Sequence, residues 1–445
     1  MTTYVGNPPF QNREQQGKTQ HKLWIKFTQT IYDQMKFGDK LLWITPQSWG
    51  SPNNKVLKIF KESEVKYVRL DTAKHFPQVG STFSNYLLTK VTPTEKHLTE
   101  VINESSRFSF SFPVLDYVPS DVCGLSLSIH HKIMGNQNEK LQVKHDYVTN
   151  HNILLKKSDT LSKVKTPKHV HPVFHTNRQV WYSSIDQPCA STKKVMWTRS
   201  GYTKPFYDDG QQGITDMGYY VAVADRAQGE KLAANLNTDL IQYIFSTAKW
   251  SGFGNERVFA ALPEKLMNCS PEDICSAFDI TLEEQEYINK YLHPVKSRSK
   301  TVRNKKESEI RSQERSDNLG EVFTPAELVN EMLDTLPEDS WDQGEKFIDP
   351  ACGNGNFLVG VIKKKIEKGS DILKALSTTY GIDIMEDNIA ECRRRILHLV
   401  VGDQEFINPL DYREHAEIIK RNIRCADSLS QPIGKILETW NEKEV

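Results

Sequence analysis

The sequence of 445 residues has no excess charge of either sign. Lysine and arginine together number 57, as do aspartate and glutamate, so the formal net charge at pH 7 is zero. Any contact with nucleic acid must therefore come from local clustering of basic residues rather than from an overall basic charge. The overall charge neither supports nor excludes DNA as a partner.

Cysteines are few, and long hydrophobic runs are missing. The seven cysteines form no C-x-x-C pair, which is typical of a reducing compartment and argues against disulfides. No apolar run approaches the length of a membrane span, and the N-terminus lacks a basic segment followed by an apolar one. We therefore expect an intracellular protein without a membrane partner. A chain of 445 residues is long enough for two or three domains.

One informative stretch lies in the last third of the chain. Residues 345–358 read EKFIDPACGNGNFL, a short apolar strand that ends at Asp349, turns at Gly353 and Gly355, and enters a helix-period run. Glycines let a backbone approach a bound molecule, and free amides at a helix start can receive a polar ligand group. The spacing differs from G-x-G-x-x-G, because Phe357 stands near the third glycine position. The stretch predicts a ligand site without identifying the ligand.

A second informative stretch opens the chain, where residues 4–10 read YVGNPPF. A short predicted strand delivers Asn7, Pro8, Pro9 and Phe10 at its carboxyl end, where open α/β sheets place their ligands. Pro8 fixes its own backbone and favours an extended Asn7, so the Asn7 Oδ1 atom and the Pro8 carbonyl can be held as two acceptors for one amino group. An isolated NPPF equally fits a proline turn beside a core phenylalanine. Together with the glycine stretch, we interpret it as a catalytic motif.

Taken together, DPACGNGNF and GNPPF resemble the cofactor and catalytic motifs of DNA adenine-N6 methyltransferases of the restriction-modification type. In most of that family the cofactor motif comes first; the order here is reversed, so the chain resembles a circularly permuted member. The resemblance implies an α/β fold with a seven-stranded, mostly parallel, Rossmann-like methyltransferase sheet and an inserted DNA-recognition domain. It also implies S-adenosyl-L-methionine as the cofactor, double-stranded DNA as the partner, and a cytoplasmic protein encoded by a bacterium or phage. A restriction endonuclease of the same system would be a functional partner, and no stable protein partner is implied.

The resemblance also assigns roles to individual positions. Asn7 and Pro8 would accept both hydrogens of the adenine N6 amino group, which favours a pyramidal nitrogen whose lone pair faces the methyl donor. Phe10 would stack on a base flipped out of the duplex, and Pro9 completes the motif. Phe83 is assigned to the core instead of the base. The implied cofactor-binding set is Phe323, Thr324, Asp349, Ala351, Gly353, Gly355, Asp383, Ile384, Asp427 and Ser428.

Two of these positions can also be interpreted from the residues alone, and a third has a local structural alternative. Thr324 is placed to cap a helix that has Pro325 in its first turn. Asp383 ends a predicted strand, where an acidic residue can accept hydrogen bonds from ribose hydroxyls, as in Rossmann dehydrogenases. Asp427 resembles the family residue that accepts from the cofactor's adenine amino group, and the alternative is a helix N-cap or Asx turn before Pro432.

Changes in pattern divide the chain into four segments, and the resemblance gives each its role. These are a catalytic half over residues 1–95, a target-recognition domain over 96–292, a basic linker over 293–319 and an S-adenosylmethionine-binding half over 320–445. Because the opening strand would follow the last helix in the unpermuted order, the two chain ends should lie close together.

The predicted target-recognition domain contains many basic and aromatic residues. Such residues suit phosphate contact and base stacking, although each alone also fits an ordinary solvated surface. They are Lys193, Lys194, Trp197, Arg199, Tyr202, Lys204, Phe206, Tyr207, Lys249, Trp250 and Phe253. Nearby, His169, His171, His175 and Cys189 match no zinc signature, and we predict no metal.

We therefore predict a sequence-specific DNA methyltransferase that transfers a methyl group to adenine N6 by base flipping and direct in-line transfer. Alternatives within the class are methylation of cytosine N4, RNA adenine or a protein glutamine amide. Glutamine methyltransferases generally lack so large an insert, and serine usually replaces the asparagine in cytosine enzymes. The alternative from another class is an inactive DNA-binding specificity subunit, against which the intact motifs argue. The prediction requires the opening motif and the distant glycine turn to line one pocket.

Overall fold

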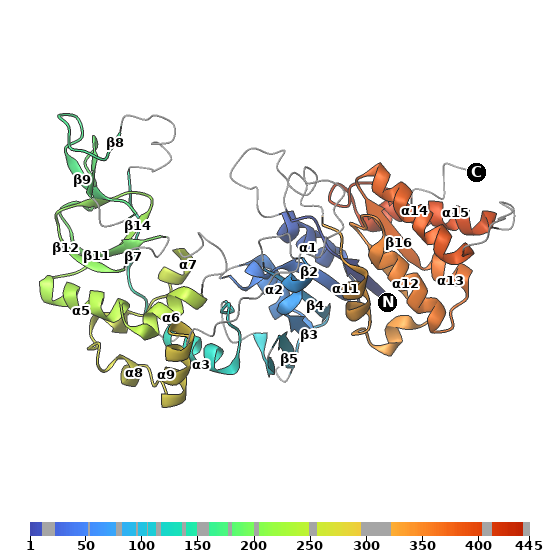
Figure 1. Cartoon of the computed structure of the whole chain (residues 1–445), viewed down its shortest axis with the longest axis horizontal. Helices are drawn as coiled ribbons and strands as arrows, with labels where there is room; N and C mark the ends of the chain where they lie inside the picture. The colour runs from blue at the N-terminus through green and yellow to red at the C-terminus, as the bar shows by residue number, and fades with distance from the viewer. Residues whose placement is uncertain are drawn as a thin grey trace. The chain divides into compact units, whose positions relative to one another are not determined.

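A computed structural model describes residues 1–10, 23–51, 54–76, 82–94, 97–104, 106–112, 117–135, 139–148, 160–176, 180–199, 204–248, 256–294, 322–402 and 412–438. The chain forms two compact units (Figure 1). Unit 1 comprises Met1–Trp49, Asn54–Pro113 and Thr301–Val445, and unit 2 comprises Gly50–Asn53 and Val114–Lys300. The predicted basic linker, 293–319, lies almost entirely outside the described residues. So do residues 439–445, and the expected closeness of the chain ends stays a prediction.

Unit 1 is built on a nine-stranded sheet with the strand order β17-β16-β15-β1-β2-β4-β3-β5-β6. The strands from β17 to β2 run parallel, whereas β4 is antiparallel to both of its neighbours. Strand β5 is parallel to β3, and β6 is antiparallel to β5. The strands are β1 (Thr2–Gly6), β2 (Lys40–Pro46), β3 (Glu64–Arg69), β4 (Phe83–Thr89), β5 (Thr99–Asn103), β6 (Ser106–Phe110), β15 (Lys346–Asp349), β16 (Thr379–Asp383) and β17 (Ile423–Cys425).

The predicted α/β class is confirmed, but the predicted number of seven strands is wrong. The two additional strands are β5 and β6, which pair with each other and extend the sheet past residue 95, where the sequence pattern predicts its end. The prediction stops there because the alternation of strand and helix stops. Strand β6 instead alternates polar residues with Phe108 and Phe110, a pattern that fits a half-exposed edge strand.

The opening strand β1 lies in the middle of this sheet, between β15 and β2. Thr3 pairs with Phe347 on one side and with Lys40 on the other. Residues 3–6 are all buried, as expected of a central parallel strand covered on both faces. Because β1, β15, β16 and β17 are parallel, the residues that follow them emerge at one edge of the sheet.

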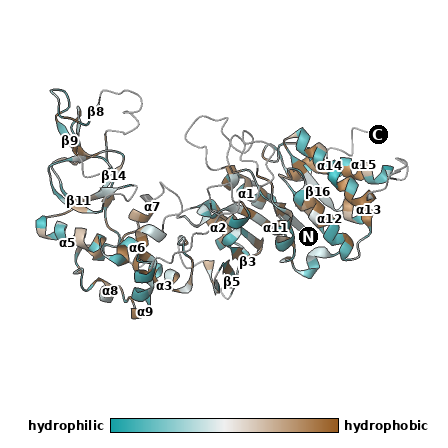
Figure 2. Ribbon diagram, viewed as in Figure 1, coloured by the Kyte–Doolittle hydropathy of each residue, from teal (hydrophilic) through white to brown (hydrophobic). Residues whose placement is uncertain are grey.

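Amphipathic helices pack on the sheet of unit 1. A buried cluster that includes Leu358, Ile389 and Ile423 joins α12, α14 and β17. In Figure 2 the helices carry both hydrophilic and hydrophobic colours, as amphipathic helices do. The helices are α1 (Leu23–Gln34), α2 (Lys55–Lys61), α11 (Ala326–Leu333), α12 (Asn356–Glu367), α13 (Ile372–Ser377), α14 (Glu386–Val401), α15 (Arg413–Asn422) and α16 (Ile433–Glu438), with 3-10 turns η1 (Gln47–Gly50), η2 (Asp71–His75) and η5 (Glu338–Trp341). Within the described residues, no helix is long and apolar enough to span a membrane.

Unit 2 contains two four-stranded sheets, ordered β13-β9-β10-β8 and β12-β11-β14-β7, and a helical core. The strands are β7 (Val143–Lys144), β8 (Leu161–Ser162), β9 (His171–Phe174), β10 (Val180–Ser183), β11 (Lys193–Thr198), β12 (Phe206–Asp209), β13 (Gly213–Ile214) and β14 (Gly218–Ala222). The helices are α3 (Gly124–Met134), α5 (Arg226–Leu236), α6 (Asp239–Thr247), α7 (Glu256–Phe259), α8 (Ile274–Ala277) and α9 (Leu282–Leu292), with the 3-10 turn η4 (Glu264–Met267). These helices pack around a large apolar core.

Two basic and aromatic residues of unit 2 whose types suit nucleic-acid contact are core residues. Trp197 is 2% exposed and Lys194 is fully buried. The Lys194 Nζ atom lies 2.7 Å from Asp208 Oδ2, and the two residues are cross-strand partners on β11 and β12. The sequence alone does not reveal this, because an ion pair within a sheet can bury a lysine whose type suggests the surface. Of the other basic and aromatic residues named above, Tyr202, Lys249, Trp250 and Phe253 lie outside the described residues.

The histidines of unit 2 have separate partners. The Nδ1 atom of His169 lies 2.8 Å from Thr166 Oγ1, and that of His175 lies 2.9 Å from Thr215 Oγ1. His171 Nδ1 lies 3.3 Å from a carboxylate oxygen of Asp186. Across the described ranges, no three His, Cys, Asp or Glu side chains are grouped so that they could hold a metal ion.

Lys365 on α12 is buried within unit 1, with 3% of its surface exposed. Its ammonium group donates to the carbonyls of Glu345 and Thr378, at 3.0 and 3.2 Å, and to Thr378 Oγ1 at 2.6 Å. It also lies 4.9 Å from the centroid of the Phe347 ring. Burial lowers the pKa of Lys365 from 10.5 to about 7, because the charged form is poorly solvated there.

This pKa predicts a pH-dependent stability. Between about pH 7 and the ordinary lysine pKa of about 10.4, the unfolded chain binds a proton that the native chain does not, so the free energy of unfolding rises with pH. We expect denaturant titrations at pH 7.5 and 9.5 to show a smaller rise for Lys365→Met than for the wild type. Lys363→Met, an exposed site on the same helix, should behave as the wild type. Equal rises in the wild type and Lys365→Met would contradict the assignment.

Candidate functional site

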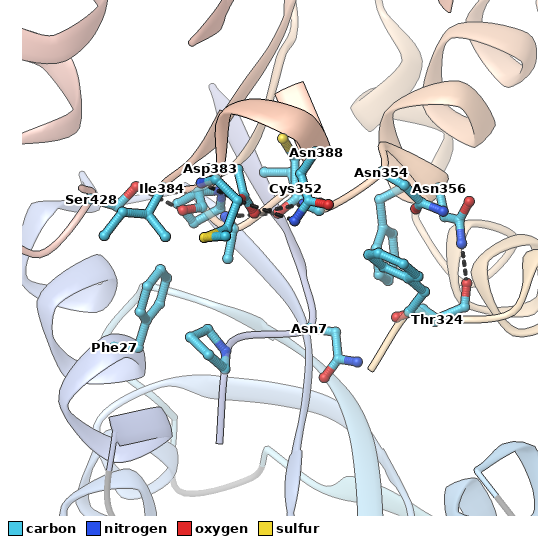
Figure 3. A pocket seen from close by; sticks show the side chains of 18 of the residues that line it. Asn7, Phe27, Thr324, Cys352, Asn354, Asn356, Asp383, Ile384, Asn388 and Ser428 are labelled. Atoms are coloured by element: carbon cyan, nitrogen blue, oxygen red, sulfur yellow. Dashed lines mark hydrogen bonds between the residues drawn. The ribbon is translucent and has the colours of Figure 1, made fainter. Parts of the chain in front are cut away.

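The carboxyl ends of the parallel strands of unit 1 surround a cavity of about 250 Å³ (Figure 3). Its walls come from the ends of β1, β15, β16 and β17, from the start of α1, and from the segment before α11. The lining residues are 322–324, 349–354, 383–385 and 426–429, together with Asn7, Pro9, Leu23, Phe27, Asn356, Phe357 and Asn388. The opening motif and the glycine turn therefore meet at one cavity.

Most of the site residues predicted from the sequence line this cavity. They are Asn7, Pro9, Phe323, Thr324, Asp349, Ala351, Gly353, Asp383, Ile384, Asp427 and Ser428. Three predicted residues, Pro8, Phe10 and Gly355, are absent from its lining. Each of the predicted residues is within the described part of the chain.

The glycine turn contains two left-handed residues with different surroundings. Gly353 has φ +51°, and a Cβ atom there would lie 3.0 Å from Cε1 of the Phe323 ring. Gly355 has φ +88°, and its Cβ atom would lie 2.5 Å from Cys392 Sγ on α14. Gly353 therefore allows an aromatic ring to lie on the turn beside the cavity. Gly355 instead allows close packing of the turn against α14, a function that its spacing alone did not reveal.

Asp349 is buried between the glycine turn and the end of β1. Its side chain is 2% exposed, and its Oδ1 atom accepts from the Ala351 amide at 3.1 Å. A Cβ atom at Gly6 would lie 2.9 Å from the same oxygen, so the opening strand approaches the carboxylate closely. Burial raises the pKa of Asp349 well above its ordinary value, and the nearby charge of Asp383 raises it further. A cationic ligand group would restore the charged form.

Asp383 is held by donors from two elements. Its Oδ2 atom accepts from the Gly353 amide at 2.9 Å. Its Oδ1 atom accepts from the Met385 amide at 2.9 Å and from Asn388 Nδ2 at 3.3 Å. The carboxylate is thereby fixed at the cavity, and Figure 3 shows it beside Asn388. Ile384 lies on the same wall with 63% of its surface exposed, which offers apolar contact to a ligand ring.

Asp427 and Ser428 follow the end of β17, and each makes a hydrogen bond with a backbone group. Asp427 Oδ1 accepts from the Leu429 amide at 2.8 Å, which is the Asx-type contact that the sequence left open. Ser428 Oγ donates to the Pro350 carbonyl at 2.7 Å. Both residues also line the cavity. A local turn and a contact with a ligand are thus compatible at Asp427.

The two polar atoms of the Asn7 side chain have different surroundings. Its Nδ2 atom donates to the Val322 carbonyl at 3.1 Å. Its Oδ1 atom is buried and has no hydrogen-bond partner in the described part of the chain. A buried acceptor left unpaired costs about 1–3 kcal/mol, so a ligand that donates a hydrogen bond there would be stabilised.

Phe10 packs within the protein. Its ring centroid lies 4.9 Å from that of Phe83, which in turn lies 5.2 Å from that of Phe76. Phe10 is 9% exposed and Phe83 is 1% exposed. The assignment of Phe83 to the core is confirmed.

The predicted helix cap at Thr324 is wrong. The structure has Pro325 at the N-cap of α11, and no side chain makes a capping hydrogen bond there. The carbonyl of Thr324 instead accepts from Asn356 Nδ2 at 2.7 Å. Proline fixes an extended backbone before the helix, so Thr324 is held at the cavity wall by its main chain.

Sequence reasoning missed Asn356, Asn388 and Arg395. Arg395 Nη1 donates to Asn356 Oδ1 at 2.6 Å and to the Asn354 carbonyl at 2.9 Å. Asn356 and Asn388 lie in the first turns of α12 and α14, each shortly after a predicted strand end. That position was the only available signal, and it does not identify the partners.

The two left-handed glycines Gly355 and Gly369 form a matched pair for a stability test. Their φ values are +88° and +89°, but a Cβ atom at Gly369 would meet nothing within 4 Å. Alanine in this conformation costs about 1–2 kcal/mol, and the contact with Cys392 should add about 1–3 kcal/mol for Gly355→Ala. We expect denaturant titrations to show Gly355→Ala as the less stable variant. Equal destabilisation of the two variants would contradict a packing role for Gly355.

Comparison with known proteins identifies a family for one segment of the chain. Residues 309–404 match the family model described as N-6 DNA Methylase. The chain is 30% identical over 93 residues to the Type II methyltransferase M.VspI of Vibrio sp. (strain 343), a match that covers 21% of this chain. The chain spans 20% of the length of this curated relative. The resemblance to N6 DNA methyltransferases of restriction-modification type is thereby confirmed.

Two solved structures are also similar. The Type IIL restriction-modification enzyme MmeI in complex with DNA is 7% identical at a TM-score of 0.31, covering 57% of this chain and 46% of that chain. The ATP-dependent Type ISP restriction-modification enzyme LlaBIII bound to DNA is 11% identical at a TM-score of 0.30, covering 65% of this chain and 28% of that chain.

Proposed function

We propose that this protein is a DNA methyltransferase that transfers a methyl group from S-adenosyl-L-methionine to N6 of an adenine in duplex DNA. The observation that carries the proposal is the buried Asn7 Oδ1 atom, which has no hydrogen-bond partner among the described residues and belongs to a residue that lines the same cavity as the glycine turn and Asp383. The family match over residues 309–404 covers the glycine turn but not Asn7. Asn7 and the glycine turn are connected because both line the same cavity.

In this proposal the methyltransferase sheet is circularly permuted. Strand β1, which precedes Asn7, comes first in the sequence. It nevertheless lies between β2 and β15, the strand that precedes the glycine turn. Unit 2 would correspond to the target-recognition domain. Its main segment, Val114–Lys300, separates Asn54–Pro113 from Thr301–Val445 of unit 1 in the sequence, and it contains basic surface residues.

The residues at the cavity fit S-adenosyl-L-methionine. Buried Asp349 suits the cationic end of the cofactor, since burial raises its pKa and a bound cation would favour the charged carboxylate. The fixed carboxylate of Asp383 suits the ribose hydroxyls, and Asp427 with exposed Ile384 suits the adenine edge and face. Phe323 would contact the methionine end. When bound, the cofactor supplies an electrophilic methyl group.

The residues of the opening motif would act on the adenine amino group. Asn7 Oδ1 and the Pro8 carbonyl would accept its two hydrogens, which favours a pyramidal N6 with its lone pair turned to the methyl carbon. A bound donor would supply the methyl group as its methyl–sulfur bond breaks, and Asn7 Oδ1 and the Pro8 carbonyl would hold the amino group until one of its protons passes to water. The side chains thus position and polarise the amino group, and no strong base is needed. Pro9 lines the cavity beside them.

The Asn7→Ala variant tests this role. We expect methyl transfer to fall by about 100-fold or more, as on removal of one preorganised polar group. Cofactor affinity measured by calorimetry should stay within about threefold, because Asn7 acts on the other ligand. Asn103→Ala, at an exposed position in unit 1, is the control. Transfer by Asn7→Ala at the wild-type rate would remove Asn7 from the mechanism.

A basic surface on unit 2 supports DNA as the substrate. Residues 160–176 include three exposed lysines, Lys163, Lys165 and Lys168, and contain no acidic residue. Val164, which lies between Lys163 and Lys165, is 66% exposed, and Val170, which follows Lys168, is 43% exposed. In a chain with no net charge, such a local excess of lysine suits contact with a phosphate backbone.

Replacing the three lysines by glutamine should weaken DNA binding in a salt-dependent way. The slope of log affinity against log salt concentration should fall by about 0.9 for each phosphate that the variant no longer neutralises. The matched control replaces Lys231, Lys265 and Lys290, which are exposed elsewhere on unit 2. Fluorescence anisotropy with labelled duplex DNA over a range of salt concentrations measures the affinity and the salt slope of both triple variants. Equal slopes for the two triple variants would contradict a special role for residues 163–168.

The substrate class is tested directly with radiolabelled S-adenosyl-L-methionine. Unmethylated duplex DNA, RNA and a protein extract are offered in parallel, and incorporated label is counted after digestion of each. We expect label in duplex DNA. Label in RNA or protein alone would contradict DNA as the substrate, and a lack of cofactor binding in calorimetry would contradict an enzymatic function.

A further inference from the structure

The segment Val322–Thr324 contacts both motifs of the cavity. The Val322 carbonyl accepts from Asn7 Nδ2 at 3.1 Å, in the opening motif. The Thr324 carbonyl accepts from Asn356 Nδ2 at 2.7 Å, directly after the glycine turn (Figure 3). All three residues of the segment line the cavity. The segment is therefore a physical link between the two halves of the site.

At its first contact, the segment selects the orientation of the Asn7 amide. An amide oxygen only accepts hydrogen bonds and an amide nitrogen only donates them. The Val322 carbonyl can pair only with the nitrogen, so the Asn7 Oδ1 atom is left as the group available for a ligand. Rotating the amide by 180° would bring two acceptors together and would offer the target amino group a donor in place of an acceptor. The position of Val322 thus decides whether Asn7 can accept.

At its other contact, the segment is fixed to the glycine turn. Arg395 Nη1 donates to Asn356 Oδ1 at 2.6 Å and to the Asn354 carbonyl at 2.9 Å, which ties the turn to α14. The Phe323 ring lies so close to Gly353 that a Cβ atom there would be 3.0 Å from it. Phe323 is also 8% exposed, so it has little freedom to move independently of the turn. A ligand held by the turn therefore contacts the element that orients Asn7.

We propose that Val322–Thr324 couples the two halves of the cavity: cofactor bound at the glycine turn and Phe323 fixes the accepting orientation of Asn7 and so strengthens binding of the target amino group. This inference rests on the proposed function. Asn356 and Arg395 act through the segment, as positioning residues. By thermodynamic linkage, a target adenine strengthens cofactor binding by the same factor.

The variant Asn356→Asp separates coupling from packing. A carboxylate keeps the contact with Arg395 but has no hydrogen to donate to the Thr324 carbonyl. Asn330→Asp is the matched control, because it makes the same substitution at an exposed position of α11 that is absent from the cavity lining. Arg395→Gln is a second variant that loosens the segment from the α14 side. Thermal unfolding establishes that each variant is folded.

The experiment uses the full chain and two duplexes. The target site is first found by sequencing DNA from an expressing host, and one duplex carries adenine at the target while the other carries purine, which lacks the 6-amino group. Dissociation constants for each duplex are measured by anisotropy with and without S-adenosylhomocysteine. The affinity of S-adenosylhomocysteine alone is measured by calorimetry.

With adenine at the target, the wild type and Asn330→Asp should bind about fivefold or more tightly when S-adenosylhomocysteine is present. With purine, the ratio should fall below about twofold, because Asn7 Oδ1 has no hydrogen to accept. Asn356→Asp should give a ratio below about twofold on both duplexes, and Arg395→Gln should lower the ratio on adenine. The affinity of Asn356→Asp for S-adenosylhomocysteine alone should stay within about threefold of the wild type.

A wild-type ratio near one, or an unchanged adenine-specific ratio in Asn356→Asp, would overturn the coupling. If the wild type methylates DNA but shows no coupling, only this inference fails. If the wild type transfers no methyl group to DNA, the proposed function fails.

Discussion

The parallel pairing of β1 with β15 is the interaction on which the site depends. It sets Thr3 beside Phe347 and Tyr4 beside Ile348, so both strands end at the same edge of the sheet. The residues that follow, Asn7 and the glycine turn, are brought together although they come from opposite ends of the sequence. Close approach at Gly6 then places the end of β1 against the buried carboxylate of Asp349. A cavity with donors and acceptors from both ends of the chain results.

Charge and polarity around the cavity are matched to different kinds of ligand group. Asp349 and Asp383 supply carboxylates, one buried and one fixed by three hydrogen bonds. Asn7 supplies a neutral acceptor. A cation and hydroxyl groups suit the carboxylates, whereas an amino group suits the amide oxygen. This division of roles supports the proposal that the cavity holds two ligands.

The parts of the site that the sequence predicted are those determined by local backbone constraints. Gly353 has a positive φ, and Asp383 stands at a strand end, so their positions follow from the chain itself. The contacts of Asn356 and Arg395 were missed because they join residues far apart in the sequence on helix faces that carry no motif. The burial of Lys194 likewise depends on Asp208 across the sheet. Strands β5 and β6, the last two of the sheet, were missed because no helix separates them.

We propose that one cavity holds a methyl donor and the target amino group in line. A bisubstrate analogue, in which adenosine is joined through N6 to the cofactor skeleton at the position of the transferred methyl group, tests this directly by calorimetry. We expect it to bind about 100-fold or more tightly than S-adenosylhomocysteine, as when both ligand parts are held as in the transition state. Asn7→Ala should lose most of this gain. An analogue that binds no more tightly than S-adenosylhomocysteine would contradict a shared cavity.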